Sequence, residues 1–196
     1  LIISVDKYGK NKQIMARGIR NTVGITFHPQ TNELWFTDNG RDMLGDDIPP
    51  GELNKVSFSG QHFGFPFCHG KSIKDPILGD LGSCSQSTPP TQELDAHVAP
   101  LGLKFYTGSQ FPNEYKNQIF IPEHGSWNRT KKSGYRITLV KLKDNHPISY
   151  ETFAEGWLKD EKTLGRPVDL IIAKDGSMLV SDDHNGVIYK ITYNSN

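Results

Sequence analysis

The sequence has no excess of either charge, little cysteine and no long apolar run. Its 22 lysines and arginines balance its 22 aspartates and glutamates, so no basic surface predicts a nucleic-acid or membrane-surface partner. No apolar run approaches the roughly 20 residues that span a bilayer, and no transmembrane segment is expected. No signal peptide is recognisable. However, the chain opens at Leu1 within the strand-like run LIISVD, so we expect a piece of a longer protein.

Only two cysteines are present, Cys68 and Cys84. Both lie in a stretch rich in Gly, Pro and Ser, which we expect to be a long loop insertion at about residues 66–98. A disulfide that clips such a loop is typical of exported proteins, because the loop has little core of its own. Two free thiols in a reducing compartment are the alternative. The loop context favours the disulfide and a periplasmic or secreted protein.

Sustained helical periodicity is also scarce, and residues 107–117 are expected to hold one short helix at most. The chain instead has 19 glycines and 12 prolines, which separate short apolar runs rich in Val, Ile, Phe and Tyr. Runs of this length and composition, bounded by turn residues, predict β-strands.

A repeat organises these strands. RNTVGITFHPQTNELWFTDNG begins at Arg20, and RPVDLIIAKDGSMLVSDDHNG begins at Arg166. A looser copy between them reads APLGLKFYTG and, after an insertion, NQIFIPEHG. Each copy is followed by one more strand-like run: ELNKVSF, GYRITLVKL or GVIYKITY.

Repeated antiparallel sheets at this spacing predict an all-β fold, a β-propeller. The runs LIISVD and KQIMARG are typical of the outer strands of a preceding blade. Residues 1–196 would then supply about three and a half blades. Since a closed propeller needs at least four blades, this count also favours a fragment.

Arg20 and Arg166 occupy equivalent places just before an inner strand. Loops from equivalent strands of a propeller converge on one face, so two guanidiniums there suit an anionic ligand. Pairing of each arginine with an acidic residue of its own or the neighbouring blade is the alternative.

Residues 37–54, TDNGRDMLGDDIPPGELN, contain five acidic residues and three glycines. Such a segment offers oxygen ligands for a hard cation such as calcium, although its spacing is not that of an EF-hand. A solvated loop is the alternative. The run EHGSWNR adds a histidine, a tryptophan and an arginine, which could supply an acid-base group and a stacking surface.

These motifs, together with GQHFGFPFCHG and AHVAPLGLKFYTG, resemble the glucose/sorbosone dehydrogenase family, with the closest likeness to its sorbosone-dehydrogenase-like branch. The resemblance covers nearly the whole chain, in order. It implies a six-bladed β-propeller, of which this chain is roughly the C-terminal half. It also implies an exported oxidoreductase that transfers hydride from a sugar to pyrroloquinoline quinone (PQQ) held by calcium and arginines, and that passes electrons to an acceptor.

The resemblance also implies roles for particular residues. The backbone carbonyls of Gly40 and Arg41 match a turn that holds the calcium of the cofactor, and Glu52 lies near a second, structural calcium position. The residues implied to face the cofactor are Arg20, Asn21, Arg166, His97, Trp127, Asn128 and Arg129.

Two departures from the family pattern are clear. The glucose-oxidising members have Pro-Gln after the Arg-Asn pair, where this chain has Thr22 and Val23. Their catalytic base is a histidine in the first half of the propeller, which is absent here. We therefore assign no catalytic residue in this chain and expect the fragment alone to be inactive.

Two other functions remain open from the sequence. One is a sugar- or partner-binding propeller that has lost the cofactor. The other is a metal-dependent lactonase-like propeller, because Asp38, Glu123 and Asp182 occupy repeat-equivalent places at which carboxylates could ring a metal.

Overall fold

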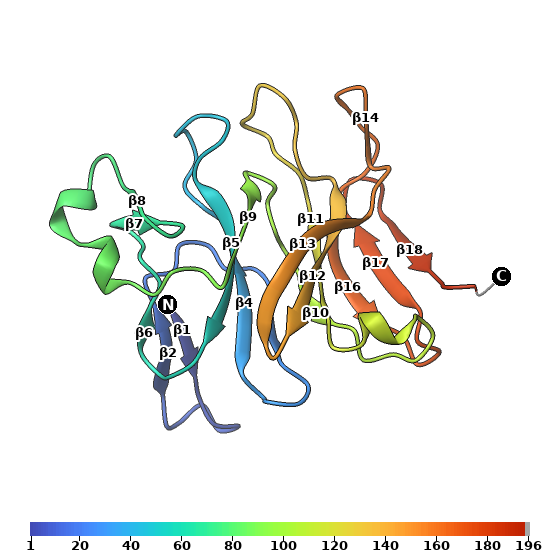
Figure 1. Ribbon diagram of the computed structural model, residues 1–196, viewed down its shortest axis with the longest axis horizontal. Coiled ribbons are helices and arrows are strands. Elements are labelled where there is room, and N and C mark those ends of the chain that lie inside the picture. Colours follow the sequence, from blue (N-terminus) through green and yellow to red (C-terminus); the bar gives the residue numbers. More distant parts are fainter. Residues whose placement is uncertain (195–196) are drawn as a thin grey trace.

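The protein is described by a computed structural model over residues 1–194, and nearly all of its regular structure is β-strand. Four sheets follow one another along the chain and stand side by side (Figure 1). No helix in this part of the chain is both long and apolar enough to cross a membrane. The predicted all-β class is confirmed.

The four main sheets use the following strands, given in their order within each sheet. The first has β1 (Ile2–Ser4), β2 (Gln13–Arg17) and β6 (Gln61–His62). The second has β3 (Ile25–Phe27), β4 (Leu34–Asp38), β5 (Pro50–Val56) and β9 (Gln92–Ala96). The third has β10 (Lys104–Phe105), β11 (Ile119–Glu123), β12 (Arg136–Lys143) and β13 (His146–Ala154). The fourth has β16 (Pro167–Ile172), β17 (Met178–Asp182) and β18 (Val187–Ile191).

The remaining elements are short. Two hairpins pair β7 (Cys68–His69) with β8 (Ile73–Lys74) and β14 (Leu158–Lys159) with β15 (Lys162–Thr163). Within residues 1–194 the helical elements are three 3₁₀ turns: η1 (Gly79–Leu81), η2 (Cys84–Gln86) and η3 (Asn113–Tyr115). The expectation of at most one short helix within residues 107–117 thus corresponds to the single turn η3.

The three sequence repeats fold as equivalent antiparallel triplets. These are β3-β4-β5, β10-β11-β12 and β16-β17-β18, and the first two gain a fourth, outer strand in β9 and β13. The turn residues between the apolar runs end each strand, and the next run then pairs with it in the antiparallel direction.

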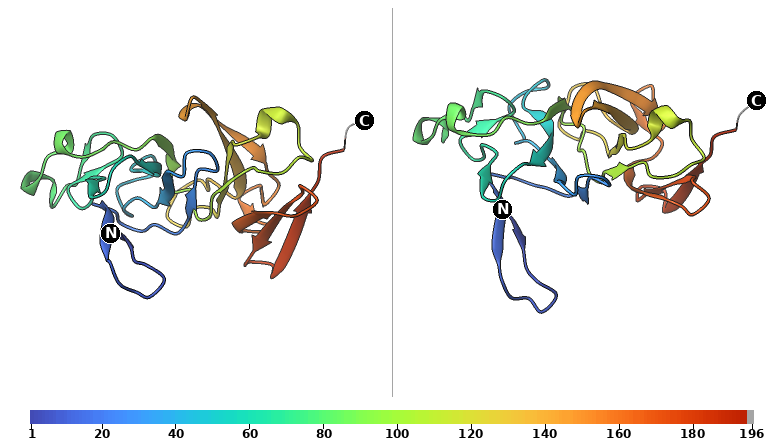
Figure 2. Two further views of the ribbon diagram at one scale, coloured as in Figure 1. Left: turned by 90° about the horizontal axis from the view of Figure 1, so that it is seen from below. Right: turned by 60° about the horizontal axis from the view of Figure 1, so that its bottom comes forward.

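The first sheet differs from the others. β1 and β2 form an antiparallel hairpin that projects from the body of the molecule (Figure 2). β6 then pairs with β2 in parallel, which the sequence did not indicate. Ala16 of β2 packs with Phe36 and Phe63, so this sheet lies against the second sheet as a preceding blade would.

The core lies between successive sheets, because neighbouring residues of a strand point to opposite faces. In β11, Ile119 and Ile121 pack towards the second sheet, around Trp35. Phe120, between them, packs towards the fourth sheet with Leu170. Each sheet is therefore buried on both faces wherever it has two neighbours, which is the packing of propeller blades.

The insertion between β5 and β9 contains β7, β8, η1 and η2. Cys68 and Cys84 form a disulfide across it, 16 residues apart in sequence. The predicted bond is confirmed, and neither cysteine is free.

Candidate functional site

The candidate site lies at one edge of the stacked sheets, where the loops after β4 and β11 emerge (Figure 1). Two aspartates build this edge in the same way. The Asp38 carboxylate, at the end of β4, accepts hydrogen bonds from the backbone N–H groups of Arg20 (3.0 Å) and Asn21 (2.7 Å). The Asp182 carboxylate, at the end of β17, accepts one from the backbone N–H of Arg166 (3.0 Å). Each repeat thus fixes the backbone of its arginine.

These aspartates are themselves largely buried. Burial raises the pKa of the Asp38 carboxyl, and its hydrogen bonds to the backbone offset only part of that effect. At Asp182 burial acts in the same direction, but the hydrogen bonds from Arg166, Asn185 and Tyr189 outweigh it and lower the pKa.

The side chain of Arg20 turns to the loop after β4. Its guanidinium donates to the Asn39 carbonyl oxygen (3.2 Å) and forms an ion pair with Asp42 (2.9 Å). This pairing within the blade is the alternative that the sequence left open. Since a guanidinium has five N–H donors and this side chain is 27% exposed, donors remain for a further acceptor.

Arg166 has a different environment. Its guanidinium donates to the Tyr135 hydroxyl (3.0 Å) and to Nδ1 of His124 (3.3 Å). Because a guanidinium cannot accept, Nδ1 of His124 is the acceptor, and the opposite ring nitrogen donates to Asp183 (2.8 Å). Within residues 1–194, no carboxylate forms a salt bridge with Arg166. Its charge is therefore available to an anion.

A second cluster joins two loops at this edge. The Asn128 amide donates to Asp42 (3.2 Å) and to Nδ1 of His97 (3.3 Å). The opposite nitrogen of His97 donates to the carbonyl oxygens of Gly45 (2.8 Å) and Ile48 (2.9 Å). Asp42 thus connects Arg20 to Asn128, and Asn128 in turn connects to His97. Sequence analysis missed Asp42 as the connecting residue, although it lies in the acidic run.

The side-chain oxygen of Asn128 is buried and has no hydrogen-bond partner among the described residues. A buried polar atom of this kind is uncommon and calls for a ligand or another donor. Trp127, beside it, is 67% exposed. Arg129 instead engages the acidic loop, through the Asp46 carbonyl oxygen and the Asp47 carboxylate (3.3 Å). Arg129 therefore holds this loop against the loop after β11.

Gly40 and Arg41 form the turn that begins the acidic loop. A Cβ at Gly40 would lie 2.8 Å from Pro49 Cγ and 2.9 Å from the Pro50 carbonyl oxygen, so only glycine fits without movement. Among the described residues, no hydrogen bond uses the carbonyl oxygens of Gly40 and Arg41. The Arg41 side chain points away from them, to Asp75 in the insertion.

Glu52 lies apart from this cluster, in the interior of the second sheet. One carboxylate oxygen accepts from the Gly70 backbone N–H (2.9 Å) and the other from the Asn54 amide (2.9 Å). Burial, reinforced by the neighbouring Asp38 carboxylate, raises its pKa to about 7. Within residues 1–194, no group of three or more His, Cys, Asp or Glu side chains is arranged to hold a metal.

Glu123, the counterpart of Asp38 in the middle repeat, serves the blade. It is fully buried and accepts hydrogen bonds from Arg136 (2.8 Å), Thr138 (3.1 Å) and the Tyr150 hydroxyl. Burial raises its pKa, and the charge of Arg136 opposes that rise. These bonds hold the carboxylate inside the third sheet.

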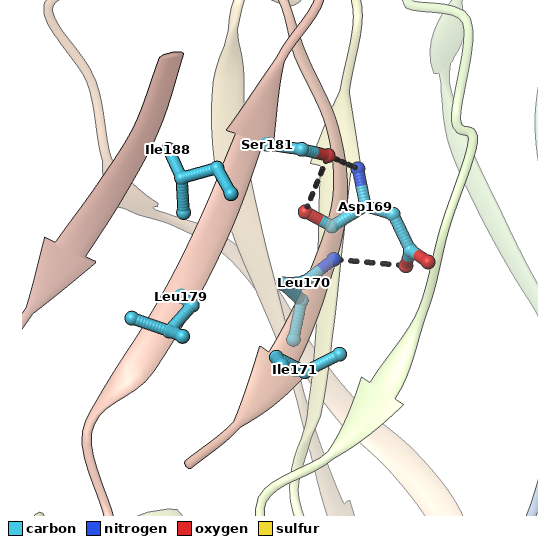
Figure 3. A pocket seen from close by; sticks show the side chains of 6 residues that line it. All are labelled: Asp169, Leu170, Ile171, Leu179, Ser181 and Ile188. Carbon is cyan, nitrogen blue, oxygen red and sulfur yellow. Dashed lines mark hydrogen bonds between the residues drawn. The ribbon is translucent and has the colours of Figure 1, made fainter.

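A shallow apolar hollow lies elsewhere, on the outer face of the fourth sheet (Figure 3). Ile171, Leu179 and Ile188 line it, and Ser181 bonds to the backbone of Asp169 at its edge. Its volume of about 170 Å³ is below the roughly 300 Å³ at which ligand pockets begin. It exposes the face on which a further sheet could pack.

Known proteins resemble this chain over nearly all of its length. An uncharacterized protein of Borreliella burgdorferi is 46% identical over 199 residues, which cover 98% of this chain and 52% of that protein. A pyrroloquinoline quinone-dependent pyranose dehydrogenase of Coprinopsis cinerea is 25% identical over 242 residues, which cover 95% of this chain and 32% of that protein. The chain thus spans about a third to a half of these curated relatives.

Solved structures show the same fold. A Trichoderma reesei carbohydrate-active enzyme of family AA12 superposes with a TM-score of 0.71 at 24% identity, over 89% of this chain and 53% of that one. The holo form of the PQQ domain of Coprinopsis cinerea pyranose dehydrogenase superposes with a TM-score of 0.71 at 19% identity, over 93% and 56%. This fold is the predicted partial β-propeller.

The family described as TrAA12-like matches residues 78–194, which is more than half of the chain. The chain therefore belongs to the TrAA12-like family.

Proposed function

We propose that this chain forms part of a PQQ-dependent sugar dehydrogenase and supplies many of the residues that bind the cofactor. One observation carries the proposal: a guanidinium without a carboxylate partner, on Arg166, shares an edge with two carbonyl oxygens that accept no hydrogen bond, on Gly40 and Arg41. The guanidinium is suited to bind carboxylates of the cofactor, and the carbonyl oxygens are suited to bind calcium. The similarity to a PQQ-dependent pyranose dehydrogenase supports the same ligand.

The residues present fit such a cofactor. Arg166 and the free donors of Arg20 would bind its carboxylates, and the buried oxygen of Asn128 would accept a hydrogen bond. The carbonyls of Gly40 and Arg41 would hold calcium. When bound, PQQ supplies a quinone that accepts hydride, and calcium polarises its carbonyl. Trp127 presents an exposed ring to the same edge.

For the other residues that the resemblance implies, we propose indirect roles. Asn21 and His97 would position backbone and loop rather than touch the cofactor, since His97 already uses both ring nitrogens. Arg129 would act through the acidic loop. The role of Glu52 at a second calcium stays a prediction, and its raised pKa fits a neutral side chain better than a ligand.

We assign no catalytic base here. At this edge, His97 and His124 each have their two ring nitrogens in hydrogen bonds. As the family pattern implies, proton removal from the sugar would fall to a histidine in the first half of the propeller, and residues 1–196 alone would be inactive. The disulfide fits an exported protein. The particular sugar, the sorbosone branch and the electron acceptor stay predictions.

The test uses the full-length protein. Equilibrium dialysis with PQQ, with and without calcium, should give saturable binding that requires calcium, and Arg166→Gln should weaken it. Aldoses and sorbosone should then reduce an artificial dye. Binding without turnover would support a non-catalytic sugar-binding propeller, and no binding of PQQ at all would refute the proposal.

The structure gives no support to a lactonase-like metal ring. Asp38, Glu123 and Asp182 are each held by hydrogen bonds within their own sheets.

A further inference from the structure

One side chain of the insertion between β5 and β9, that of Asp75, contacts the turn of the candidate site. Asp75, which is 5% exposed, lies inside this disulfide-closed segment. One of its carboxylate oxygens accepts from the backbone N–H groups of Ile77 (2.9 Å) and Leu78 (2.8 Å). The other accepts from His69 (3.0 Å) and from Arg41. Four donors thus meet on one buried carboxylate.

Three of these four donors belong to the insertion, but Arg41 comes from the turn after β4, 34 residues earlier. Because the other three donors hold the Asp75 carboxylate in place, the guanidinium of Arg41 has a fixed anchor.

A second contact path joins the same two segments. At Gly70 of the insertion, an added Cβ would lie 2.8 Å from Pro50 Cγ. At Gly40 of the turn, it would lie 2.9 Å from the carbonyl oxygen of the same proline. Gly70 and Gly40 thus both lie close against Pro50, which couples the insertion to the turn through packing.

We propose that Asp75 is a positioning residue, through which the disulfide-closed insertion fixes the carbonyl oxygens of Gly40 and Arg41 for their ligand. This inference rests on the proposed function for the identity of that ligand. It does not require Asp75 to touch calcium or PQQ, because Asp75 binds the side chain of Arg41 while the proposed ligand binds its carbonyl.

The first test needs no cofactor. Trypsin cleaves after arginine, and cleavage after Arg41 requires its side chain to leave Asp75. In the full-length protein, trypsin should cleave the Asp75→Asn variant after Arg41 about tenfold faster than it cleaves wild type, because exposed loops are cut when their contacts loosen. Asp80→Asn is the matched control, since Asp80 is an exposed carboxylate of the same insertion paired with Lys74. Trypsin should cleave this control variant at the wild-type rate.

The second test measures PQQ binding in the presence of calcium by equilibrium dialysis. Asp75→Asn should weaken binding about tenfold, as expected for loss of a charge-assisted hydrogen bond that holds the turn. Arg41→Gln should weaken it equally, and the double variant no further, because both changes break one contact. Asp80→Asn should bind as wild type.

The outcomes separate the two proposals. If wild type binds no PQQ, the proposed function fails, while the trypsin result still tests whether Asp75 holds the side chain of Arg41. If wild type binds PQQ but Asp75→Asn equals Asp80→Asn in both assays, the positioning role is overturned. If Asp75→Asn does not fold, Arg41→Gln decides: wild-type affinity in this variant would overturn the role.

Discussion

Gly40→Ala provides the sharpest test of the candidate calcium turn. The added Cβ would lie 2.8 Å from Pro49 Cγ and 2.9 Å from the Pro50 carbonyl oxygen, whereas ordinary contact begins at 3.4 Å. One side must therefore move by about 0.5 Å. A proline ring and a strand carbonyl are rigid, so we expect the turn to move and its carbonyl oxygens to point in a different direction.

The expected magnitude follows from this overlap. Overpacking of this kind costs about 1–3 kcal/mol of folding free energy. Because about 1.4 kcal/mol corresponds to a tenfold change in affinity, strain of that size at the turn would weaken PQQ binding about tenfold. Calcium-dependent PQQ titration and a thermal unfolding midpoint measure the two effects separately.

Asp46→Asn is the matched comparison for Gly40→Ala. The Asp46 side chain is half-buried and its carboxylate accepts from the Thr130 backbone N–H (3.0 Å), and an amide oxygen would still accept this bond. We expect less than about a twofold change in affinity, well below the 1.4 kcal/mol of a tenfold effect. Wild-type affinity in Gly40→Ala, with weakened binding in Asp46→Asn, would refute the carbonyl site and indicate that the carboxylates bind the cation.

Three further predictions concern other parts of the chain. Arg166→Lys should weaken PQQ binding about tenfold in dialysis, because lysine cannot reproduce the planar fork; Arg20→Lys should weaken it less, because Asp42 already pairs with that charge. Glu123→Gln should lower the free energy of unfolding in urea by about 2 kcal/mol, since it removes the buried one of the two carboxylates that bind Arg136 and leaves the more exposed Asp95. The double change Cys68→Ser with Cys84→Ser should cost about 3 kcal/mol in thermal unfolding, as expected for a closed loop of this length.

Each of these predictions has its own control. Equal losses in the two arginine variants would contradict the difference between their environments. Glu151→Gln removes a surface carboxylate from Lys141 and should cost less than about 1 kcal/mol, so a similar loss in Glu123→Gln would contradict its buried role. Wild type in reductant should unfold like the double serine variant, and an unchanged midpoint would show that the disulfide adds no stability.

The repeat explains why much of the fold could be predicted. Arg20 with Asp38, and Arg166 with Asp182, have the same backbone contact at 3.0 Å, because equal local sequence gives equal strand ends. The apolar runs between them also match the observed strands. These features depend on short-range patterns, which a single sequence contains.

The site was predicted less completely, because its contacts join distant loops. Asp42 meets Asn128 across 86 residues, and Asp75 meets Arg41 across 34. Loop conformation decides such contacts, and no periodic pattern encodes it. Glu123 shows a second limit. It occupies the expected repeat position, yet its partner is the side chain of Arg136 rather than a backbone N–H.

The aspartate that ends each second strand has an evolutionary consequence. Asp38 and Asp182 hold the backbone of Arg20 and Arg166, and neither contact uses a guanidinium. Selection for folding therefore acts on the aspartates, whereas selection for an anionic ligand acts on the arginine side chains. A lineage that abandons the ligand would keep both aspartates while its arginines drift. The fate of these two positions across relatives would thus record separately whether the scaffold or the chemistry was retained.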